Sequence, residues 1–341
     1  MDSSRIANLS KPLSIGQVTV PNRVFLAPMS GVSDRVFREI ASEAGAGLVV
    51  SEMVASDALV RGEAESLMRA EKAGSGPHVI QLAGREARWM AEGARAATDA
   101  GADIIDINMG CPAKKVTSGY SGSALMRDLD HALTLIDATV GATHLPVTLK
   151  MRLGWDDTSI NAPELARRAE QAGVQMITVH GRTRCQFYGG AADWKAIRAV
   201  KDAISIPLIA NGDLELIDRL ETMLELSGAD GVMIGRGAYG RPWFPGEVAA
   251  YVSTRAAPAP LERRILIERM LRHYEGLLEL YGSIFGARVA RKHLGWYVDR
   301  HGFAADGAGT AVRARLMTEN DPKVVRRTIS ALLEADLELA A

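Results

Sequence analysis

Amide, cationic and thiol side chains, with glycines between them, follow several short apolar segments of the chain. Groups of this kind bind anions and donate protons, and they differ from the branched aliphatic residues that fill a hydrophobic core. They can act on one substrate only if the fold brings them together. The positions are Met29, Glu52, Gln81, Asn108, Cys111, Lys150, Arg152, His180, Arg182, Arg184, Asn211, Asp213 and Arg236.

Cys111 lies in a loop sequence, Asn-Met-Gly-Cys-Pro at 108–112, directly after an apolar segment. A free cysteine usually packs in a core as a small hydrophobic residue, but a Gly/Pro loop is not a core position. An ordinary thiol pKa of about 8.5 leaves the group mostly protonated at neutral pH. Cys111 is therefore a candidate general acid, whereas Cys185 is interpreted as a residue without a catalytic role.

Two glycine-containing turns, Asn211-Gly212-Asp213 and Gly235-Arg236-Gly237, follow the last two apolar segments. Glycines let backbone N–H groups approach a phosphate, and Arg236 would add charge-assisted hydrogen bonds. The alternative is that these glycines only form tight turns. The Gly-x-Gly-x-x-Gly match at 235–240 is not followed by a second strand with an acidic residue, so it does not indicate a dinucleotide site.

Lys150 and His180 also end apolar segments. Lys150 could face the anionic edge of a cofactor or an enolate oxygen, and the alternative is a solvated lysine. His180 is followed by Arg182 and Arg184, which favours anion binding over a purely structural histidine. No second ligand stands at metal-binding spacing, so we predict no metal site.

Eight short segments rich in Val and Ile are predicted to be strands buried on both faces. Amphipathic helix patterns lie between them, and four of these, at 34–44, 86–100, 162–172 and 214–227, stop at a glycine. This alternation predicts an α/β fold, a (β/α)8 TIM barrel, with an open doubly wound sheet as the alternative. The predicted strands are Arg23–Pro28, Gly47–Glu52, His78–Leu82, Asp103–Asn108, Pro146–Met151, Gln175–His180, Ile206–Asn211 and Asp230–Gly235.

The predicted barrel occupies residues 1–253, an Ala/Pro-rich linker 254–260, and an all-helical domain 261–341. In a barrel, residues at the carboxyl ends of the strands surround one mouth, so the polar residues described above should meet there.

Composition narrows the classes of protein to consider. With 47% hydrophobic and 24% charged residues the chain is not disordered, and 40 basic against 41 acidic residues exclude a uniformly basic nucleic-acid binder. We find no apolar run of about 20 residues and no apolar signal core, so neither a membrane span nor a secretory signal is predicted. With only two cysteines, the chain is expected to be cytoplasmic.

Seven sequence segments together resemble tRNA-dihydrouridine synthases. They are APMSGVSDRVFR at 27–38, DINMGCPAKKV at 106–116, PVTLKMRLGW at 146–155, TVHGRTRCQFYGGAADW at 178–194, IANGD at 209–213, MIGRGAYGRPW at 233–243 and ARKHLGWY at 290–297. The last is similar to the bacterial B branch of that family, and the resemblance covers nearly the whole chain. One departure, SGYSGS at 118–123, affects no candidate site residue.

The resemblance implies an FMN-bearing barrel that reduces the C5–C6 bond of a uridine in tRNA, with NADPH as reductant and a helical domain that helps to hold the tRNA. It implies that Cys111 is the proton donor and that Asn108 contacts the uracil. By analogy the B branch suggests position 17 of the D-loop. The residues implied to bind the flavin are Ala27, Pro28, Met29, Gln81, Lys150, His180, Asn211, Gly212, Asp213, Gly235 and Arg236.

Basic residues in the helical domain fit an RNA partner, because residues 286–327 hold nine Lys/Arg against four Asp/Glu. The alternative is a solvated helix surface. Two other functions stay open: an FMN barrel acting on a small molecule such as a free pyrimidine, and a non-catalytic RNA-binding protein. The oligomeric state is open, with a monomer favoured. The predicted substrate contacts are Asn108, Arg152, Arg182, Arg291, Lys292, Arg326 and Arg327.

Overall fold

The structure is a computed structural model that describes residues 3–303 and 307–333. The chain divides into two compact units, which are described separately below. The first unit is an α/β barrel, and the second is helical. The barrel unit consists of Met1–Gly237 and Pro245–Arg255, and the helical unit of Ala238–Phe244 and Ala256–Ala341.

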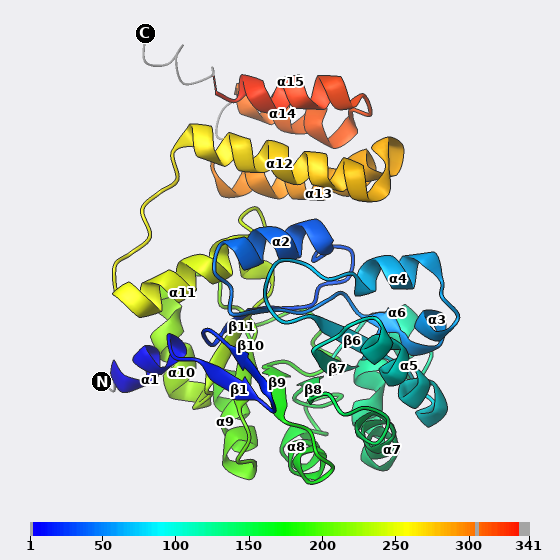
Figure 1. Ribbon diagram of the computed structural model, residues 1–341. Helices are drawn as coiled ribbons and strands as arrows, with labels where there is room; N and C mark the ends of the chain where they lie inside the picture. Colours follow the sequence, from blue (N-terminus) through cyan, green and yellow to red (C-terminus); the bar gives the residue numbers. More distant parts are fainter. Residues whose placement is uncertain (1–2, 304–306, 334–341) are drawn as a thin grey trace. The chain divides into compact units, whose positions relative to one another are not determined.

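A parallel sheet forms the centre of the barrel unit (Figure 1). Eight of its strands overlap the eight predicted segments, and β5, at residues 54–55, lies outside the predicted segment 47–52. The strand order is β4-β3-β11-β10-β9-β8-β7-β6-β5. The strands are β3 (Val24–Leu26), β4 (Leu48–Val49), β5 (Val54–Ala55), β6 (Val79–Ala83), β7 (Ile104–Met109), β8 (Val147–Arg152), β9 (Met176–His180), β10 (Leu208–Asn211) and β11 (Gly231–Ile234).

The sheet closes on itself through residues 48–55. At one end of this segment β4 pairs with β3, and at the other end β5 pairs with β6. Between them Val50 forms a parallel bridge with Val79, and the Ser51 N–H donates to the Val79 carbonyl at 3.1 Å. Both edges of the sheet therefore belong to one segment, which confirms the barrel and excludes the doubly wound alternative.

Helices surround the strands (Figure 1). The four predicted helices are present, and the glycines that end them, Gly45, Gly101, Gly173 and Gly228, all have positive φ. The last helix begins only at Ile217, with a 3-10 turn, because the chain first passes through Asp213, whose φ is 56°. The larger helices are α2 (Arg35–Glu43), α5 (Ala87–Asp99), α7 (Leu129–Val140), α8 (Ala162–Gln171), α9 (Trp194–Ala203), α10 (Leu220–Ser227) and α11 (Phe244–Thr254).

Shorter helical pieces lie in the connections and were not predicted. The helices α3 (Ser56–Val60) and α4 (Ala64–Ala70) follow β5. The helix α6 (Lys114–Thr117) and the 3-10 helix η1 (Gly122–Arg127) follow β7, directly after Cys111. These pieces are too short for a hydrophobic period to show in the sequence.

A hairpin of β1 (Leu13–Ile15) and β2 (Val18–Val20), after the helix α1 (Ser3–Leu9), was also not predicted. Its apolar side chains pack with residues at the amino ends of the strands, among them Val79, Ile104 and Met176. The hairpin therefore covers the end of the barrel opposite the carboxyl ends of the strands. Gly16 allows its tight turn, since φ is 57° and a Cβ there would lie 2.2 Å from Gln175 Oε1.

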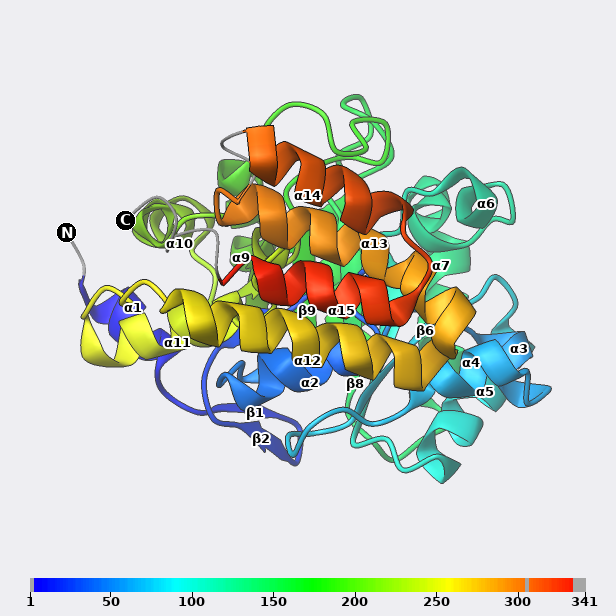
Figure 2. The ribbon, with the colours of Figure 1, turned by 90° about the horizontal axis from the view of Figure 1, so that it is seen from above.

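The helical unit contains α12 (Arg263–Tyr281), α13 (Ser283–Arg300), α14 (Gly307–Thr318) and α15 (Pro322–Ala331), which lie side by side (Figure 2). Gly286 allows α12 and α13 to approach closely, because a Cβ there would lie 2.5 Å from the Leu277 carbonyl oxygen. Residues 238–244 pack in this unit, where Tyr239 stacks on Trp296 with ring centroids 3.9 Å apart. No helix among the described residues has the length and apolarity to cross a bilayer.

Candidate active site

The carboxyl ends of the barrel strands bring the predicted polar residues together. The parallel registers pair Asn108 with Lys150, Arg152 with His180, and His180 with Asn211. Register partners on neighbouring parallel strands point to the same side of the sheet. Lys150 reaches past β9, and its Nζ donates to Asn211 Oδ1 at 3.1 Å. Residues far apart in sequence thus form one polar cluster at the mouth.

The loop that carries Cys111 is fixed at both of its ends. Asn108 Oδ1 accepts the backbone N–H groups of Gly110 at 3.2 Å and Cys111 at 3.0 Å. Ser123 donates its N–H and its hydroxyl to the Cys111 carbonyl, at 3.1 and 2.8 Å. Burial raises the pKa of the Cys111 thiol. The thiol therefore stays protonated at neutral pH, as a proton donor requires.

Lys150 is enclosed by the barrel, and burial is the main reason that its pKa is lowered to about 8, with the nearby Arg152 charge acting in the same direction. Asn211, its hydrogen-bond partner, is held in turn, because Asn211 Nδ2 donates to the Met233 carbonyl at 2.8 Å. At neutral pH Lys150 is mostly an ammonium group at a fixed position. Such a group can stabilise negative charge that develops beside it.

His180 is neutral. Burial, followed by the charges of Lys150 and Arg152, lowers its pKa well below the ordinary value. Its Nδ1 is buried and has no hydrogen-bond partner among the described residues. A buried polar atom without a partner is uncommon and suggests that a bound group completes the site. This observation fits the predicted position of His180 beside a cofactor.

Arg152 connects the two loops that flank the cluster. It is buried, and its guanidinium donates to the carbonyls of Gly110 at 2.9 Å, Thr183 at 2.8 Å and Phe187 at 2.8 Å. Burial, the largest cause, lowers its pKa to about 10, so the cation persists at neutral pH. These contacts join the Cys111 loop to the loop after β9. Contact of Arg152 with substrate stays a prediction.

Arg182 and Asp213 form a second buried connection. The Arg182 guanidinium binds both Asp213 carboxylate oxygens, at 2.8 and 2.6 Å, and only 1% of Arg182 is exposed. Asp213 also accepts from Arg236 and from the Ala192 N–H, both at 2.8 Å. Burial opposes ionisation of this carboxyl, but the hydrogen bonds and charges of the two arginines hold its pKa below the ordinary value. Asp213 thereby orders the loops after β9, β10 and β11, and its role in phosphate binding stays a prediction.

The predicted flavin contacts at the ends of β3 and β11 are neighbours. The Ala27 N–H donates to the Ile234 carbonyl at 2.8 Å. A Cβ built on Gly235 would lie 3.7 Å from Met29 Sδ and 3.8 Å from the Ala27 Cβ. These small and apolar residues, together with the glycines, provide a surface against which a flat ring system could lie.

The structure adds aromatic residues that sequence reasoning did not select. The Trp155 ring lies 4.9 Å from the Arg127 guanidinium and 4.7 Å from that of Arg184. Tyr188 is 55% exposed, and its ring lies within 6 Å of the Arg152 and Arg236 guanidinium groups. Aromatic residues interleaved with arginines in the loops after β8 and β9 were the signal that could have found them.

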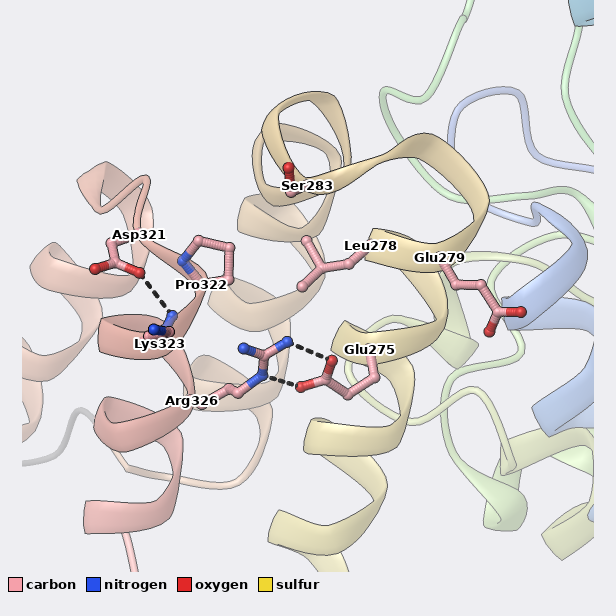
Figure 3. Close-up of a pocket in the computed structure, with 8 residues that line it drawn as sticks. All are labelled: Glu275, Leu278, Glu279, Ser283, Asp321, Pro322, Lys323 and Arg326. Atoms are coloured by element: carbon pink, nitrogen blue, oxygen red, sulfur yellow. Dashed lines mark hydrogen bonds and ion pairs between the residues drawn. The ribbon is translucent and has the colours of Figure 1, made fainter.

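Two of the basic residues predicted to contact tRNA have partners within the helical unit. Arg326 points across to Glu275 and binds both of its carboxylate oxygens, beside a hollow of about 530 Å³ that Glu279 and Asp321 also line (Figure 3). Arg291 donates to Asn320 Oδ1 at 2.8 Å and to the Thr318 carbonyl at 3.0 Å. These contacts hold helices together.

Other basic residues of this unit are exposed. Arg327 lies with Arg315 on a groove of about 430 Å³ between α14 and α15, and neither makes an ion pair with any described residue. Lys292, also a predicted tRNA contact, is half-buried on α13. Among residues 3–303 and 307–333, no three His, Cys, Asp or Glu side chains gather as metal ligands would.

Comparison with solved structures agrees with the barrel. A histamine dehydrogenase from Rhizobium sp. 4-9 matches 78% of this chain and 51% of its own, with a TM-score of 0.55 and 16% identity. Morphinone reductase matches 76% of this chain and 92% of its own, with a TM-score of 0.52 and 16% identity. Likeness at this identity shows the fold alone.

Sequence comparison is more specific. A probable tRNA-dihydrouridine synthase of Rhizobium leguminosarum bv. phaseoli is 58% identical over 93% of this chain and 97% of that protein. The tRNA-dihydrouridine synthase B of Xanthomonas campestris pv. campestris is 46% identical over 89% of this chain and 91% of that protein. The model of the dihydrouridine synthase (Dus) family matches residues 25–334. With the polar mouth described above, these matches show that the chain belongs to the dihydrouridine synthase family.

Proposed function

We propose that this chain reduces specific uridines in tRNA to 5,6-dihydrouridine, with bound FMN and with NADPH as the reductant. The observation that carries the proposal is the position of Cys111, a half-buried thiol with a raised pKa, on a fixed loop beside Asn108 and Lys150. Family membership and the names of the relatives support the reaction class and a flavin. tRNA as the partner, a monomer, a cytoplasmic location and position 17 of the D-loop belong to the same proposal.

The residues present fit a flavin. The orphaned His180 Nδ1 and the Lys150 ammonium can bind its polar ring edge, and Gln81, which accepts a hydrogen bond from Asn108, would bind it too. Ala27, Pro28 and Met29 would lie against the ring. Arg236, with the backbone of Gly212 and Gly235, would hold the phosphate end. When bound, the flavin supplies a hydride to C6 of the uracil.

Cys111 then gives a proton to C5. Negative charge develops on the uracil oxygen as the hydride arrives, and the nearby Lys150 ammonium can stabilise it. Asn108 is held by its neighbours and can orient the uracil edge. The target base must leave the RNA stack to enter the barrel mouth. The Tyr188 ring is exposed and offers a surface on which an unstacked RNA base can stack.

The proposal is tested with tRNA from a strain that lacks the gene. That tRNA should gain dihydrouridine at position 17 when it is incubated with the purified protein, FMN and NADPH, as mapped by reverse transcription or mass spectrometry. A yellow protein with flavin absorption is expected as purified. Turnover of free uridine without tRNA would instead support a small-molecule enzyme, and a colourless protein that binds RNA would support a non-catalytic one.

A further inference from the structure

Asp106 is a buried carboxylate on β7 to which the predicted mechanism gives no role. It is 4% exposed. Its Oδ2 accepts from Gln81 Nε2 at 2.7 Å, and its Oδ1 accepts from the Thr148 hydroxyl at 2.6 Å. Gln81 and Thr148 are its register partners on β6 and β8. The three side chains therefore form one row inside the barrel, below the polar cluster.

A continuous chain of hydrogen bonds leads from Asp106 to Cys111. Gln81 Oε1 accepts from Asn108 Nδ2 at 2.7 Å. Asn108 Oδ1 accepts the Cys111 N–H at 3.0 Å. The first two links join side chains of β6 and β7, the last joins the Asn108 side chain to the Cys111 backbone, and Gln81 and Asn108 are both buried. The carboxylate and the thiol loop are thus connected through two amides.

The groups at the two ends of this hydrogen-bond chain require the same orientation of the Gln81 and Asn108 amides. Asp106 Oδ2 accepts from the Gln81 NH2 group, so the Gln81 oxygen is turned toward Asn108. A backbone N–H only donates, so Asn108 must turn its oxygen toward Cys111. Both demands are met without an unsatisfied group. Without an acceptor at position 106, the Gln81 NH2 would be buried and unpaired, which favours rotation of the amides.

A buried carboxyl group at this position has a desolvation cost that an apolar side chain would not have. Burial raises the pKa of Asp106, while hydrogen bonds from Gln81 and Thr148 and the charge of Lys150 act in the opposite direction. Apolar residues fill barrel interiors without that cost, and a buried charge is weak evidence for stability. The presence of a carboxyl group at position 106 is explained if it orients the amides of Gln81 and Asn108.

We infer that Asp106 is a positioning residue for the reaction, which holds the Cys111 loop in place through Gln81 and Asn108. Its part in the reaction rests on the proposed function. The hydrogen-bond chain itself does not, and it is tested separately.

The two cysteines make a direct test possible. Protein labelled with [15N]cysteine gives only two amide signals, from Cys111 and Cys185, and the Cys185 N–H bonds the Trp155 carbonyl in a different loop. Asp106→Leu keeps the branching and the number of side-chain heavy atoms but cannot accept a hydrogen bond. It should shift the Cys111 signal and speed exchange of that amide by about 2- to 10-fold, as expected for one lost hydrogen bond. The Cys185 signal should stay in place.

Two variants distinguish loss of the hydrogen-bond chain from a general disruption of the fold. Asp106→Asn keeps an acceptor and should return the Cys111 signal close to its parental position. Thr148→Val removes the other partner of Asp106, outside the chain, and should leave Cys111 unmoved. If Asp106→Leu does not fold, Gln81→Met cuts the next link and should give the same shift. A Cys111 signal that is unchanged in a folded Asp106→Leu or Gln81→Met variant overturns the connection.

Kinetics test the role in the reaction. Asp106→Leu should lower kcat for dihydrouridine formation while KM for tRNA stays within about twofold, and Asp106→Asn should recover most of the loss. An unchanged kcat, with a shifted Cys111 signal, overturns the positioning role. If the parental protein forms no dihydrouridine, the proposed function fails and the role in that reaction fails with it, while the NMR result still decides whether the hydrogen-bond chain exists.

Discussion

Charged side chains have opposite surroundings in the barrel mouth and in the helical unit. In the mouth, Arg152, Arg182 and Lys150 are enclosed, and each binds a group from another strand or loop. In the helical unit, Arg315 and Arg327 are exposed on a groove, while Arg291 and Arg326 hold helices together. A charge buried at a strand end thus orders a site, whereas an exposed charge on a helix becomes useful to a partner only when no neighbour neutralises it.

The comparison also shows why arginine has several roles here. Arg152 uses its fork of donors on three backbone carbonyls, and Arg182 uses it on one carboxylate and two carbonyls. An arginine whose donors are already occupied can position loops but has few donors left for a phosphate. We therefore expect buried groups to carry the chemistry and exposed groups to carry RNA affinity.

The largest effect is expected at the thiol. Cys111→Ala should reduce dihydrouridine formation by about 10²–10⁴-fold, because general acid catalysis contributes a factor of this size. FMN binding and NADPH oxidation should stay close to parental values, since the thiol is needed only for the proton at C5. Rates of NADPH oxidation and of dihydrouridine formation are measured side by side. Cys185→Ala, at an exposed position, is the matched control, and near-parental turnover by Cys111→Ala would contradict the assignment.

Lys150 should make the stability of the flavin-free protein depend on pH. Its pKa falls from 10.5 in the unfolded chain to about 8 in the folded protein, so the unfolded chain binds more protons between these values. The free energy of unfolding should therefore rise with pH for the parent relative to Lys150→Met, by about 2–3 kcal/mol between pH 7 and pH 10. Urea denaturation of both proteins at the two pH values measures this difference. An equal change in both proteins would mean that Lys150 is solvated.

Arg236 tests the contribution of a partly exposed cation. Arg236→Ala should weaken FMN binding by about 1.5–3 kcal/mol, or roughly 10- to 150-fold in Kd, through loss of a charge-assisted phosphate contact. Flavin fluorescence in a dilution series measures it. The control is Arg198→Ala, whose guanidinium donates to the Glu225 carbonyl on the outside of the barrel. Equal retention of FMN by the Arg236 variant and the parent would show that the phosphate binds elsewhere.

The smallest effect is expected on the salt dependence of tRNA binding. Replacing Arg315 and Arg327 by Ala should flatten the slope of log K against log salt by about 0.9 per lost duplex phosphate contact, or about 0.7 for single strands. The pair Arg291→Ala and Arg326→Ala should leave the slope nearly unchanged and lower the stability of the helical unit, because these residues bind other helices. The flavin spectrum should not change in either variant. A larger change of slope in the Arg291/Arg326 variant than in the Arg315/Arg327 variant would mean that the residues binding other helices contact the RNA.

Regular elements of the barrel could be predicted because each carries a repeated signal. Each of the eight predicted segments is an apolar run that overlaps a strand of the sheet, and the four glycines predicted to end helices have positive φ. The hairpin at 13–20 was missed because its strands have three residues each, too few for an alternating pattern to show. The helix α14 lies within the predicted all-helical domain, although its face is not clearly amphipathic and two glycines lie within its first three residues.

Taken alone, the sequence determined the residue types at the strand ends and, through the alternation of strands and helices, the fold that gathers them. A parallel barrel makes that inference possible, since its topology sends every carboxyl strand end to one mouth. Only the tertiary structure decided which partners these groups have. Three pairs illustrate this: Asp106 with Gln81, Arg182 with Asp213, and Arg326 with Glu275. Their side chains are 25, 31 and 51 positions apart in the sequence. Such pairs leave no local pattern, because hydrogen bonds and charges act through space and not along the chain.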